Sequence, residues 1–358
     1  MESGYILSQE QGPIPVEDSK IKTGADVLYS DNSYADYYDI GGITINWLWI
    51  AIPLLFLALV VYIFFAVGKK LKKKDRNEKA EKGVLMEVRV PRNNESEIGV
   101  AEKMFANLYG IGGKGEGFAK KFTVSNCVSF EVIGLPGEIR FFVHCPQKYA
   151  DLVEKQILGS YQDADVTVVD EYNIFAPGNQ IAYAKLVLEG EPYCPIRTAG
   201  DFTGDPMANI LSTLSKMAEN EGALVQLVVA PSDQIWQKRG SSFVQKVESN
   251  NSDPAKKKIN VSQEKLQAIK KKISKPGLIA EIRIVTSAPN KEIAKMHLDN
   301  IIGAFDQYSN PGINKLKKKK INPKSAKSFL YDVIYRRSPE SEKSILNLEE
   351  LAGIYHFP

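Results

Sequence analysis

The sequence is poor in the residues and short motifs that mark common catalytic centres. It holds three cysteines and three histidines in 358 residues, and neither set has the spacing of zinc ligands. No Walker A or Walker B motif occurs in it, and no GxSxG or HExxH motif. These absences argue against a zinc enzyme, a serine hydrolase and a P-loop nucleotidase. We therefore predict no catalytic, cofactor-binding or metal-binding residue.

Charge of neither sign is in large excess. Lysine and arginine number 46 against 43 acidic residues, and the hydrophobic and charged fractions are 44% and 25%. These fractions are typical of a globular protein, and the length allows two or three domains. Cysteine is too scarce for a disulfide-stapled chain, so Cys127, Cys145 and Cys194 are expected to be free thiols in a reducing cytosol.

One long apolar run contains no charged residue. Trp47–Val67 reads WLWIAIPLLFLALVVYIFFAV, close to the ~20 residues that a helix needs to cross ~30 Å of hydrocarbon. A cleavable signal peptide fits poorly, because 46 residues precede the run and are acidic overall. We predict a transmembrane helix over 43–68.

The two flanks of this run carry opposite charge. Residues 1–46 have eight acids and two lysines, whereas residues 69–82 have eight bases and three acids. Basic flanks stay in the cytoplasm, so we predict a single pass through the cytoplasmic membrane with the N-terminus outside and the C-terminal domains in the cytoplasm. Residues 1–42 are then a disordered extracytoplasmic tail and 69–83 a basic linker. The linker either only sets the topology or also attracts anionic lipid. The candidate contacts are Lys69, Lys70, Lys72, Lys73 and Lys74.

Residues 84–176 alternate between strand and helix patterns. Short β-branched and aromatic runs predict strands, and apolar residues three and four apart predict helices. The expected strands are 84–90, 128–133, 139–145 and 166–169, and the expected helices are 95–108 and 147–158. The order βαββαβ is that of a ferredoxin-like domain.

Residues 177–340 repeat this order with insertions. The expected strands are 181–188, 224–229, 278–286 and 328–335, and the expected helices are 205–217 and 291–305. The predicted fold class is α+β, with one N-terminal transmembrane helix followed by two tandem ferredoxin-like (βαββαβ) domains. Such a repeat suits a pseudo-twofold pair.

Two lysine-rich stretches lie in the second half, an insertion at 232–277 and a loop at 315–324. Both are expected to be exposed and mobile, either as solvated loops or as non-specific contacts for nucleic-acid phosphates. The candidate contacts are Lys270, Lys271, Lys272, Lys317 and Lys318. Acidic residues inside strands, such as Glu131 and Glu281, are expected on the solvent face.

A glycine-rich loop follows the first predicted helix. Gly110–Gly115 matches GxGxxG by letter, but a dinucleotide site needs a strand before the glycines and a helix after them. We interpret it as the loop that ends the helix, with Gly110 as its C-cap. RRM-like RNA binding is also disfavoured, because GEIRFFV at 137–143 matches the required strand pattern poorly.

Three phrases resemble a known family. They are VLMEVRVPRNNESEIGVAEKMFANLYG from Val84, VSFEVIGLPGEIRFFVHCPQKYADLVEKQILGSYQDADVTVVDEYNIF from Val128, and the closing NLEELAGIYHFP. Over 40–358 the chain resembles the N-terminal, membrane-anchored region of conjugation or type IV secretion ATPases. These are FtsK/HerA-like motors of small-genome bacteria, in which the last phrase leads through a proline-rich linker into a P-loop ATPase core.

Because the sequence contains no Walker motif and no arginine finger, the resemblance implies an anchoring and assembly region without the ATPase core. The expected function is a non-enzymatic, membrane-anchored module of a type IV secretion or conjugation-like system for DNA or protein translocation. It would form a homo-oligomer and hold a P-loop ATPase, encoded nearby or fused in relatives, at the cytoplasmic face. The chain is then either a stand-alone accessory subunit or the front part of a longer or split protein.

Two alternatives stay open. One is a nucleic-acid-contacting accessory subunit that uses the lysine-rich loops to contact DNA. The other is an enzyme with a site in the cleft between the two predicted domains. Steep salt dependence of binding favours the first, and converging titratable groups with shifted pKa values favour the second.

The C-terminal segment 341–358 is unusually apolar. A free chain end is usually polar and frayed unless it is docked. We therefore expect Leu346–Pro358 to pack either on the second predicted domain or on an ATPase core, with Leu351, Ile354 and Phe357 as the contacts.

Overall fold

The chain divides into two units, Met1–Ala66 and Val67–Pro358. The computed structural model describes residues 37–40, 43–81, 83–91, 94, 96–109, 126–339 and 344–358.

The first unit holds a hairpin and most of one long helix. Strands β1 (Tyr37–Ile40) and β2 (Ile43–Asn46) pair antiparallel, and helix α1 (Trp47–Glu81) follows directly. The sequences YYDI and ITIN flank two glycines, which is a hairpin signal. The prediction of a disordered tail over 1–42 is therefore wrong for 37–40. The part of the tail before Tyr37 lies outside the described residues.

Helix α1 contains a stretch that is long and apolar enough to cross a bilayer. Ile50–Gly68 has 19 residues with a mean hydropathy of 2.9, and none of it is buried. The helix then continues to Glu81 through the predicted linker at 69–83. The linker prediction is wrong in this respect, because lysine, glutamate and alanine favour helix and no glycine or proline interrupts them before Gly83.

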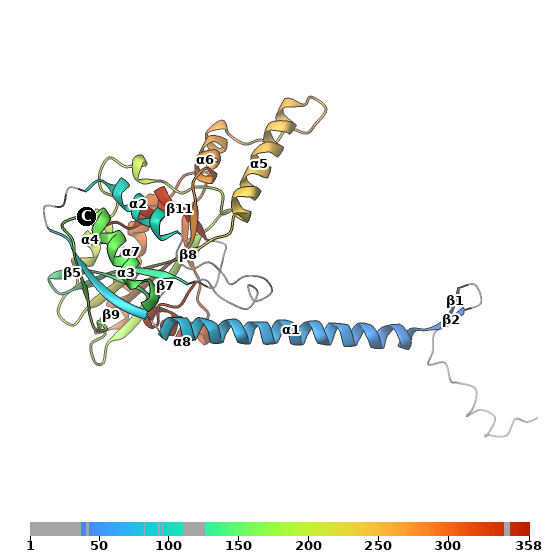
Figure 1. The fold of residues 1–358 in the computed structure, drawn as a ribbon, viewed down its shortest axis with the longest axis horizontal. Helices are drawn as coiled ribbons and strands as arrows, with labels where there is room; N and C mark the ends of the chain where they lie inside the picture. Colours follow the sequence, from blue (N-terminus) through green and yellow to red (C-terminus); the bar gives the residue numbers. More distant parts are fainter. Residues whose placement is uncertain are drawn as a thin grey trace, which may run out of the picture. The chain divides into compact units, whose positions relative to one another are not determined.

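The second unit is built on one antiparallel sheet of nine strands (Figure 1). The order along the sheet is β10-β7-β9-β8-β4-β5-β3-β6, and β11 pairs with β9 beside this path. The strands are β3 (Gly83–Arg89), β4 (Val128–Leu135), β5 (Glu138–Pro146), β6 (Asp165–Val168), β7 (Gln180–Leu188), β8 (Gly222–Pro231), β9 (Gly277–Ala288), β10 (Leu316–Lys319) and β11 (Ile345–Asn347).

Eight further α-helices accompany this sheet in the described part of the chain. They are α2 (Ile98–Leu108), α3 (Ala150–Ser160), α4 (Ala208–Leu214), α5 (Ile235–Ser252), α6 (Gln263–Ile273), α7 (Lys291–Phe305), α8 (Ala326–Ile334) and α9 (Leu348–Ile354). Short 3-10 turns lie at Gln147–Tyr149, Ala199–Asp201, Asp306–Tyr308 and Pro323–Ser325.

The sheet joins the two predicted repeats into one structure. The first repeat contributes the strand order β6-β3-β5-β4, and the second contributes β10-β7-β9-β8. The repeats meet where β4 pairs with β8, from Val128 opposite Val229 to Gly134 opposite Ala223. The predicted α+β class is confirmed, but the strands of both repeats form a single continuous sheet.

The two faces of the sheet bury different side chains, because successive residues of a strand point to opposite faces. Phe130 and Val132 of β4 lie in the larger core, together with side chains from α2, α3, α4, α7 and α9. Ile133 of the same strand lies in a smaller core on the other face, where α8 contributes Phe329 and Val333.

The last strand of the second repeat is not where the sequence predicted it. Residues 328–335 were expected to form a strand, but Ala326–Ile334 is helix α8. Phe329, Asp332 and Val333 are its buried residues, and their spacing of three and one is that of a helical face. The closing strand is instead β10, which lies in the lysine-rich stretch 315–324 that was predicted to be a mobile loop.

The lysine-rich insertion at 232–277 is also ordered rather than a mobile loop. It forms the helices α5 and α6, which pack on each other through Val244, Val247, Leu266 and Ile269. Ser262 caps α6 by accepting a hydrogen bond from the Lys265 backbone N–H. The high lysine content masked the apolar face of this helix pair.

The C-terminal segment belongs to the core of its own chain. Leu351, Ile354 and Phe357 are 0%, 4% and 0% exposed and lie in the larger core. Asn347 and Glu350 form a capping box that starts α9. These three apolar side chains therefore have no surface to offer to a partner ATPase, and the docking role predicted for 341–358 is corrected to a structural one over the described residues 344–358.

Candidate functional site

A row of polar side chains crosses the sheet on the face that α8 covers. Lys185 lies opposite Arg283 on neighbouring strands, and Arg283 lies opposite Gln226. Gln226 in turn lies opposite Glu131. Directly opposite residues share one face of a sheet. We call these four residues the polar row, and each of them is at most 9% exposed.

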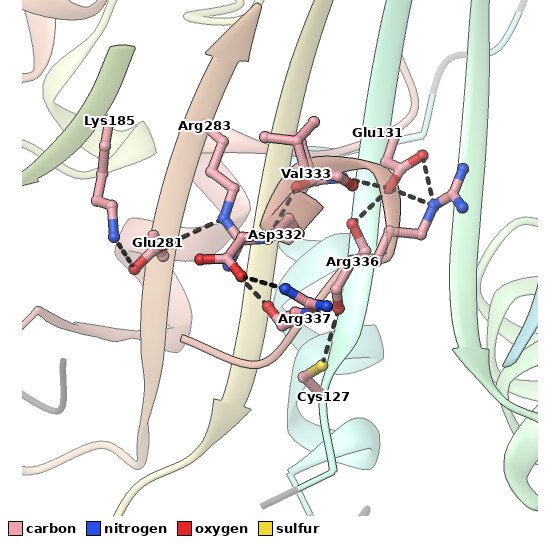
Figure 2. A network of polar contacts seen from close by, with 11 residues as sticks. Cys127, Glu131, Lys185, Glu281, Arg283, Asp332, Val333, Arg336 and Arg337 are labelled. Atoms are coloured by element: carbon pink, nitrogen blue, oxygen red, sulfur yellow. Dashed lines mark hydrogen bonds and ion pairs between the residues drawn. The ribbon is translucent and has the colours of Figure 1, made fainter. Parts of the chain in front are cut away.

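Glu131 is the carboxylate of the polar row, and it is fully enclosed. It is 0% exposed and lies 2.9 Å from Nε of Arg336, the residue pair shown in Figure 2. Ser129, Tyr172 and Gln226 donate further hydrogen bonds to it at 2.7, 2.7 and 2.8 Å. Burial raises the pKa of Glu131, but the Arg336 charge and these hydrogen bonds outweigh it and hold the pKa below its usual range.

A second carboxylate, Glu281, lies two residues before Arg283 on the same strand face. It pairs with Nζ of Lys185 at 2.8 Å and with Nε of Arg283 at 2.7 Å. Burial opposes its charge, but the two cations outweigh burial and lower its pKa to about 2. The carboxylate is therefore ionised at neutral pH and fully paired.

The end of α8 and the residues that follow it cover the polar row. Arg283 donates to the backbone carbonyls of Asp332 and Arg337, the latter at 2.7 Å, and Gln226 donates to the carbonyl of Val333 at 3.1 Å. In Figure 2, Asp332 and Arg337 lie beside Arg283. The cluster thus fastens α8 to four strands, and its charges compensate one another.

The sequence prediction placed Glu131 and Glu281 on the solvent face, and this is wrong. The two residues are 0% and 3% exposed. A signal was available, because charged or amide residues recur near the middle of four strands, among buried apolar neighbours. Without knowing that β4 pairs with β8, the sequence did not show that these residues lie in one row.

Away from the polar row, a further buried ion pair joins α6 to α9. Nζ of Lys272 lies 3.0 Å from Glu350, and both side chains are 0% exposed. Lys272 also donates to the carbonyls of Cys194 and Ile345 at 3.3 and 2.9 Å, so each of its three N–H groups has an acceptor. Burial lowers the pKa of Lys272 and raises that of Glu350.

A surface pocket with a cavity volume of about 390 Å³ opens beside this pair. Its charged lining residues are Arg197, Lys271, Lys272, Asp201, Glu264 and Glu349. Three positive and three negative side chains give the pocket no preference for an anion or a cation.

The predicted lysine contacts do not gather in one place. Lys272 is buried and is not a surface cation, which corrects its assignment as a phosphate contact. Four others form exposed ion pairs, namely Lys270 with Glu248, Lys271 with Glu349, Lys317 with Glu189 and Lys318 with Asp299. The remaining five, Lys69, Lys70, Lys72, Lys73 and Lys74, lie on α1.

Cysteine and histidine form no metal centre among the described residues, where no group of three potential ligands comes together. Cys145 and Cys194 are free thiols, and burial raises the pKa of Cys145 to about 12, with a smaller contribution from Cys127. A thiol with this pKa is a poor nucleophile at neutral pH. The glycine loop at 110–115 lies outside the described residues.

Fold and site together define a mixed α+β protein with one long apolar helix and a charge-compensated sheet. Residues 67–358 match a family described as a domain of unknown function (DUF8128), and the chain belongs to this family. No curated protein matches the sequence.

Two solved oxidoreductases have weak structural similarity to the chain. An aclacinomycin oxidoreductase is 10% identical with a TM-score of 0.32, over 63% of this chain and 41% of that one. GilR, an oxidoreductase that catalyses the terminal step of gilvocarcin biosynthesis, is 11% identical with a TM-score of 0.32, over 63% and 42%. The matched part of this chain spans about two fifths of each of these proteins.

Proposed function

We propose that this chain is a non-enzymatic, membrane-anchored assembly module of a conjugation or type IV secretion-like translocation system. In this role it holds a P-loop ATPase at the cytoplasmic face. The observation that carries the proposal is the exposed apolar stretch Ile50–Gly68, which passes without a break into the basic turns of α1. Exposed apolar surface of this length needs a bilayer or a partner to cover it.

The charged interior of the second unit fits a structural role. Glu131 of the polar row and the neighbouring Glu281 are paired with arginine or lysine at 2.7 to 2.9 Å. Buried groups that are this well compensated are held in one protonation state and are closed to a substrate. They favour a rigid platform over acid–base chemistry.

The two halves of the sheet are, in this proposal, ferredoxin-like units joined edge to edge. Each half has the chain order βαββαβ, if α5 and α6 are counted as an insertion between β8 and β9. In each half the first and third strands are central, and the second and fourth lie outside them. The pairing of β4 with β8 would then relate the halves as a pseudo-twofold pair.

Recruitment to the membrane tests the proposed function. The full chain is co-expressed in bacteria with the nearby-encoded P-loop ATPase, and the ATPase is expected to sediment with membranes and to stay with the chain after detergent extraction. Leu55→Arg with Leu59→Arg in α1 should release both proteins, whereas the matched control Lys70→Gln should not. An ATPase that stays soluble beside a membrane-bound chain would contradict the proposal.

A second candidate function is contact with single-stranded nucleic acid. The rings of Tyr331 and Tyr335 on and after α8 stack 5.9 Å apart and are 39% and 40% exposed. Arg337 lies 5.8 and 5.4 Å from their centroids, and Lys327 lies 5.8 Å from that of Tyr331. Exposed rings beside cations suit base stacking.

Titration of labelled single-stranded DNA tests this candidate. Tyr331→Ala with Tyr335→Ala should weaken binding by about tenfold or more, since each stacked base contributes about 1–3 kcal/mol. Met296→Ala, an exposed apolar residue on α7, serves as the control. This role is excluded if the double tyrosine variant binds the DNA as tightly as the unaltered chain. It is also excluded if binding does not weaken as the salt concentration rises.

A further inference from the structure

We propose that copies of this chain join head to tail through the two outer strands of the sheet, with β10 of one copy pairing with β6 of the next. This deepens the proposed function, on which it rests, by naming the surface through which the module assembles.

The two outer strands each have one free edge. Among the described strands, β10 pairs only with β7, and β6 pairs only with β3. The outer edge of such a strand presents backbone N–H and C=O groups that a further strand can pair with. Three of the four residues of each strand are exposed.

The direction of the strands permits a head-to-tail arrangement. Every pairing from β10 to β6 is antiparallel, and this path contains eight strands. With an even number, the two outer strands run in opposite directions. A second copy placed alongside in the same orientation therefore brings its β10 antiparallel to β6, and the two faces of its sheet continue those of the first copy.

Charge selects this arrangement over symmetric ones. The exposed residues of β10 are Lys317, Lys318 and Lys319, whereas β6 begins at the exposed Asp165, two residues after the exposed Asp163. Like charges directly opposite each other destabilise a strand pair, and opposite charges stabilise it. Pairing β10 with β10 places lysine opposite lysine and is disfavoured. Pairing β6 with β6 gains no ion pair, whereas the unlike edges attract.

One register also matches the faces of the two sheets. In this register Asp165 lies opposite Lys319, and Thr167 lies opposite Lys317. All four side chains point to the face of the polar row. This follows because Thr167 lies opposite Glu87 within the chain, and Lys319 lies opposite Lys185. The same register places Val168, which is 70% exposed, against Leu316 on the opposite face, which carries the larger core. An exposed valine thereby gains an apolar neighbour.

Four residue pairs make a short contact, so the local concentration of the chain matters. Anchoring in one plane raises the effective concentration of neighbouring copies. The test is therefore done with the full chain reconstituted into lipid vesicles. A head-to-tail contact of this kind is heterologous and continues to a ring or an open filament.

Disulfide cross-linking between the edges tests the proposal. The variant with both Thr167→Cys and Lys317→Cys should give a ladder of dimers, trimers and larger species under mild oxidation. A mixture of the two single variants should give dimers only, and each single variant alone, like the unaltered chain, should give none. The pairs from Asp165 or Thr167 to Lys317 or Lys319 are scanned to cover a shift of two residues.

Charge exchange provides the matched control. Asp165→Lys should lower the ladder yield about threefold, the effect of an exposed ion pair of about 0.6 kcal/mol, and adding Lys319→Asp should restore it. Asp170→Lys, outside β6, should have no such effect. Three results would each overturn the edge pairing. They are homodimers from a single-cysteine variant, a ladder that forms only with added DNA, and the absence of a ladder in every scanned pair. If the last result comes with an ATPase still held at the membrane, only the edge pairing fails.

Discussion

Arg336 occupies a backbone conformation that usually belongs to glycine. Its φ is +46°, and it directly follows Tyr335, the C-cap of α8. Glycine is favoured at this position because it has no Cβ to strain. The arginine is retained there because its guanidinium pairs with the buried Glu131 at 2.9 Å. At this residue the charge pair outweighs the backbone preference.

Arg336→Gly separates these two effects. The change relieves about 1 kcal/mol of backbone strain but leaves Glu131 buried without its cation, which costs about 3–5 kcal/mol. We expect a net loss of about 2–4 kcal/mol in the free energy of unfolding, measured by denaturant titration. Asn220→Gly is the control, because Asn220 also has a positive φ, of 62°, but is exposed. A stabilised Arg336→Gly variant would show that the ion pair contributes little.

His144 gives the fold a dependence on pH. It is 7% exposed and so close to Gly83 that a Cβ there would meet its ring. Burial, helped by the charge of Arg336, lowers the pKa of His144 to about 4. The folded state therefore keeps this imidazole neutral where the unfolded chain, with a pKa of about 6.5, binds a proton.

Stability should fall as the pH falls from about 6.5 to 4, because over this window the unfolded chain binds more protons. The expected loss is about 3 kcal/mol, followed below about pH 4.5 by a further loss from Glu281, whose pKa is lowered to about 2. Denaturant midpoints at several pH values measure both. His144→Gln should make the free energy of unfolding nearly independent of pH between 6.5 and 4, and it should keep the further loss below about pH 4.5. An equal slope between pH 6.5 and 4 in both proteins would contradict the assignment.

At the scale of elements, the C-terminal segment is held by α6 as well as by the core. Lys272 of α6 and Glu350 of α9 form a fully buried pair, and the Phe357 ring packs in a cluster with Tyr161 and Tyr355. The lysine-rich helix pair therefore stabilises the end of the chain through one residue that points inward. Its other lysines remain on the surface.

Lys272→Met should destabilise the fold by about 3–5 kcal/mol, because it leaves Glu350 as an unpaired buried charge. Adding Glu350→Gln removes that charge and should recover most of the loss, since the amide oxygen still accepts from the Ile196 backbone N–H. Thermal or denaturant unfolding of the two variants measures the difference. Lys270→Met, on the exposed side of α6, is the control and should change stability little. Equal losses in the single and double variants would exclude a charge effect.

The elements were predictable where one pattern dominated. Helix α7 begins and ends at the predicted residues, 291 and 305, and seven predicted strands are present within a few residues of their expected bounds. The pattern failed in α8, where SFLYDVIY alternates well enough to suggest a strand although its buried residues follow a helical face. It failed again at β10, because three consecutive lysines in an outer strand resemble a loop.

The candidate site was the part least visible in the sequence. Glu131, Gln226 and Arg283 are far apart in the chain, and only the pairing of β8 with β4 and β9 brings them together. The burial of Lys272 likewise depends on which side of α6 meets α9. Both the polar row and the burial of Lys272 depend on contacts between distant parts of the chain. The local spacing of residues in the sequence does not predict such contacts.

At the scale of the whole molecule, the two halves share one sheet whose outer strands differ in charge. The β10 edge is basic and the β6 edge is acidic, while the charges in the centre compensate one another. In the proposed assembly, these properties suit a platform that is rigid inside and associates at its edges. An anchor in the first unit would confine such platforms to one plane.

The membrane topology is the feature on which the proposed assembly depends. Ser3→Cys and Ser252→Cys are introduced separately into a chain whose native cysteines have been replaced. Intact cells are then treated with a membrane-impermeant thiol reagent. Ser252 lies on α5 and is exposed in the second unit. The acidic N-terminal flank and the basic turns after the apolar stretch predict labelling at position 3 and none at position 252 until the cells are lysed. Labelling at position 252 in intact cells, or at neither position, would contradict a single-pass anchor with its platform in the cytoplasm.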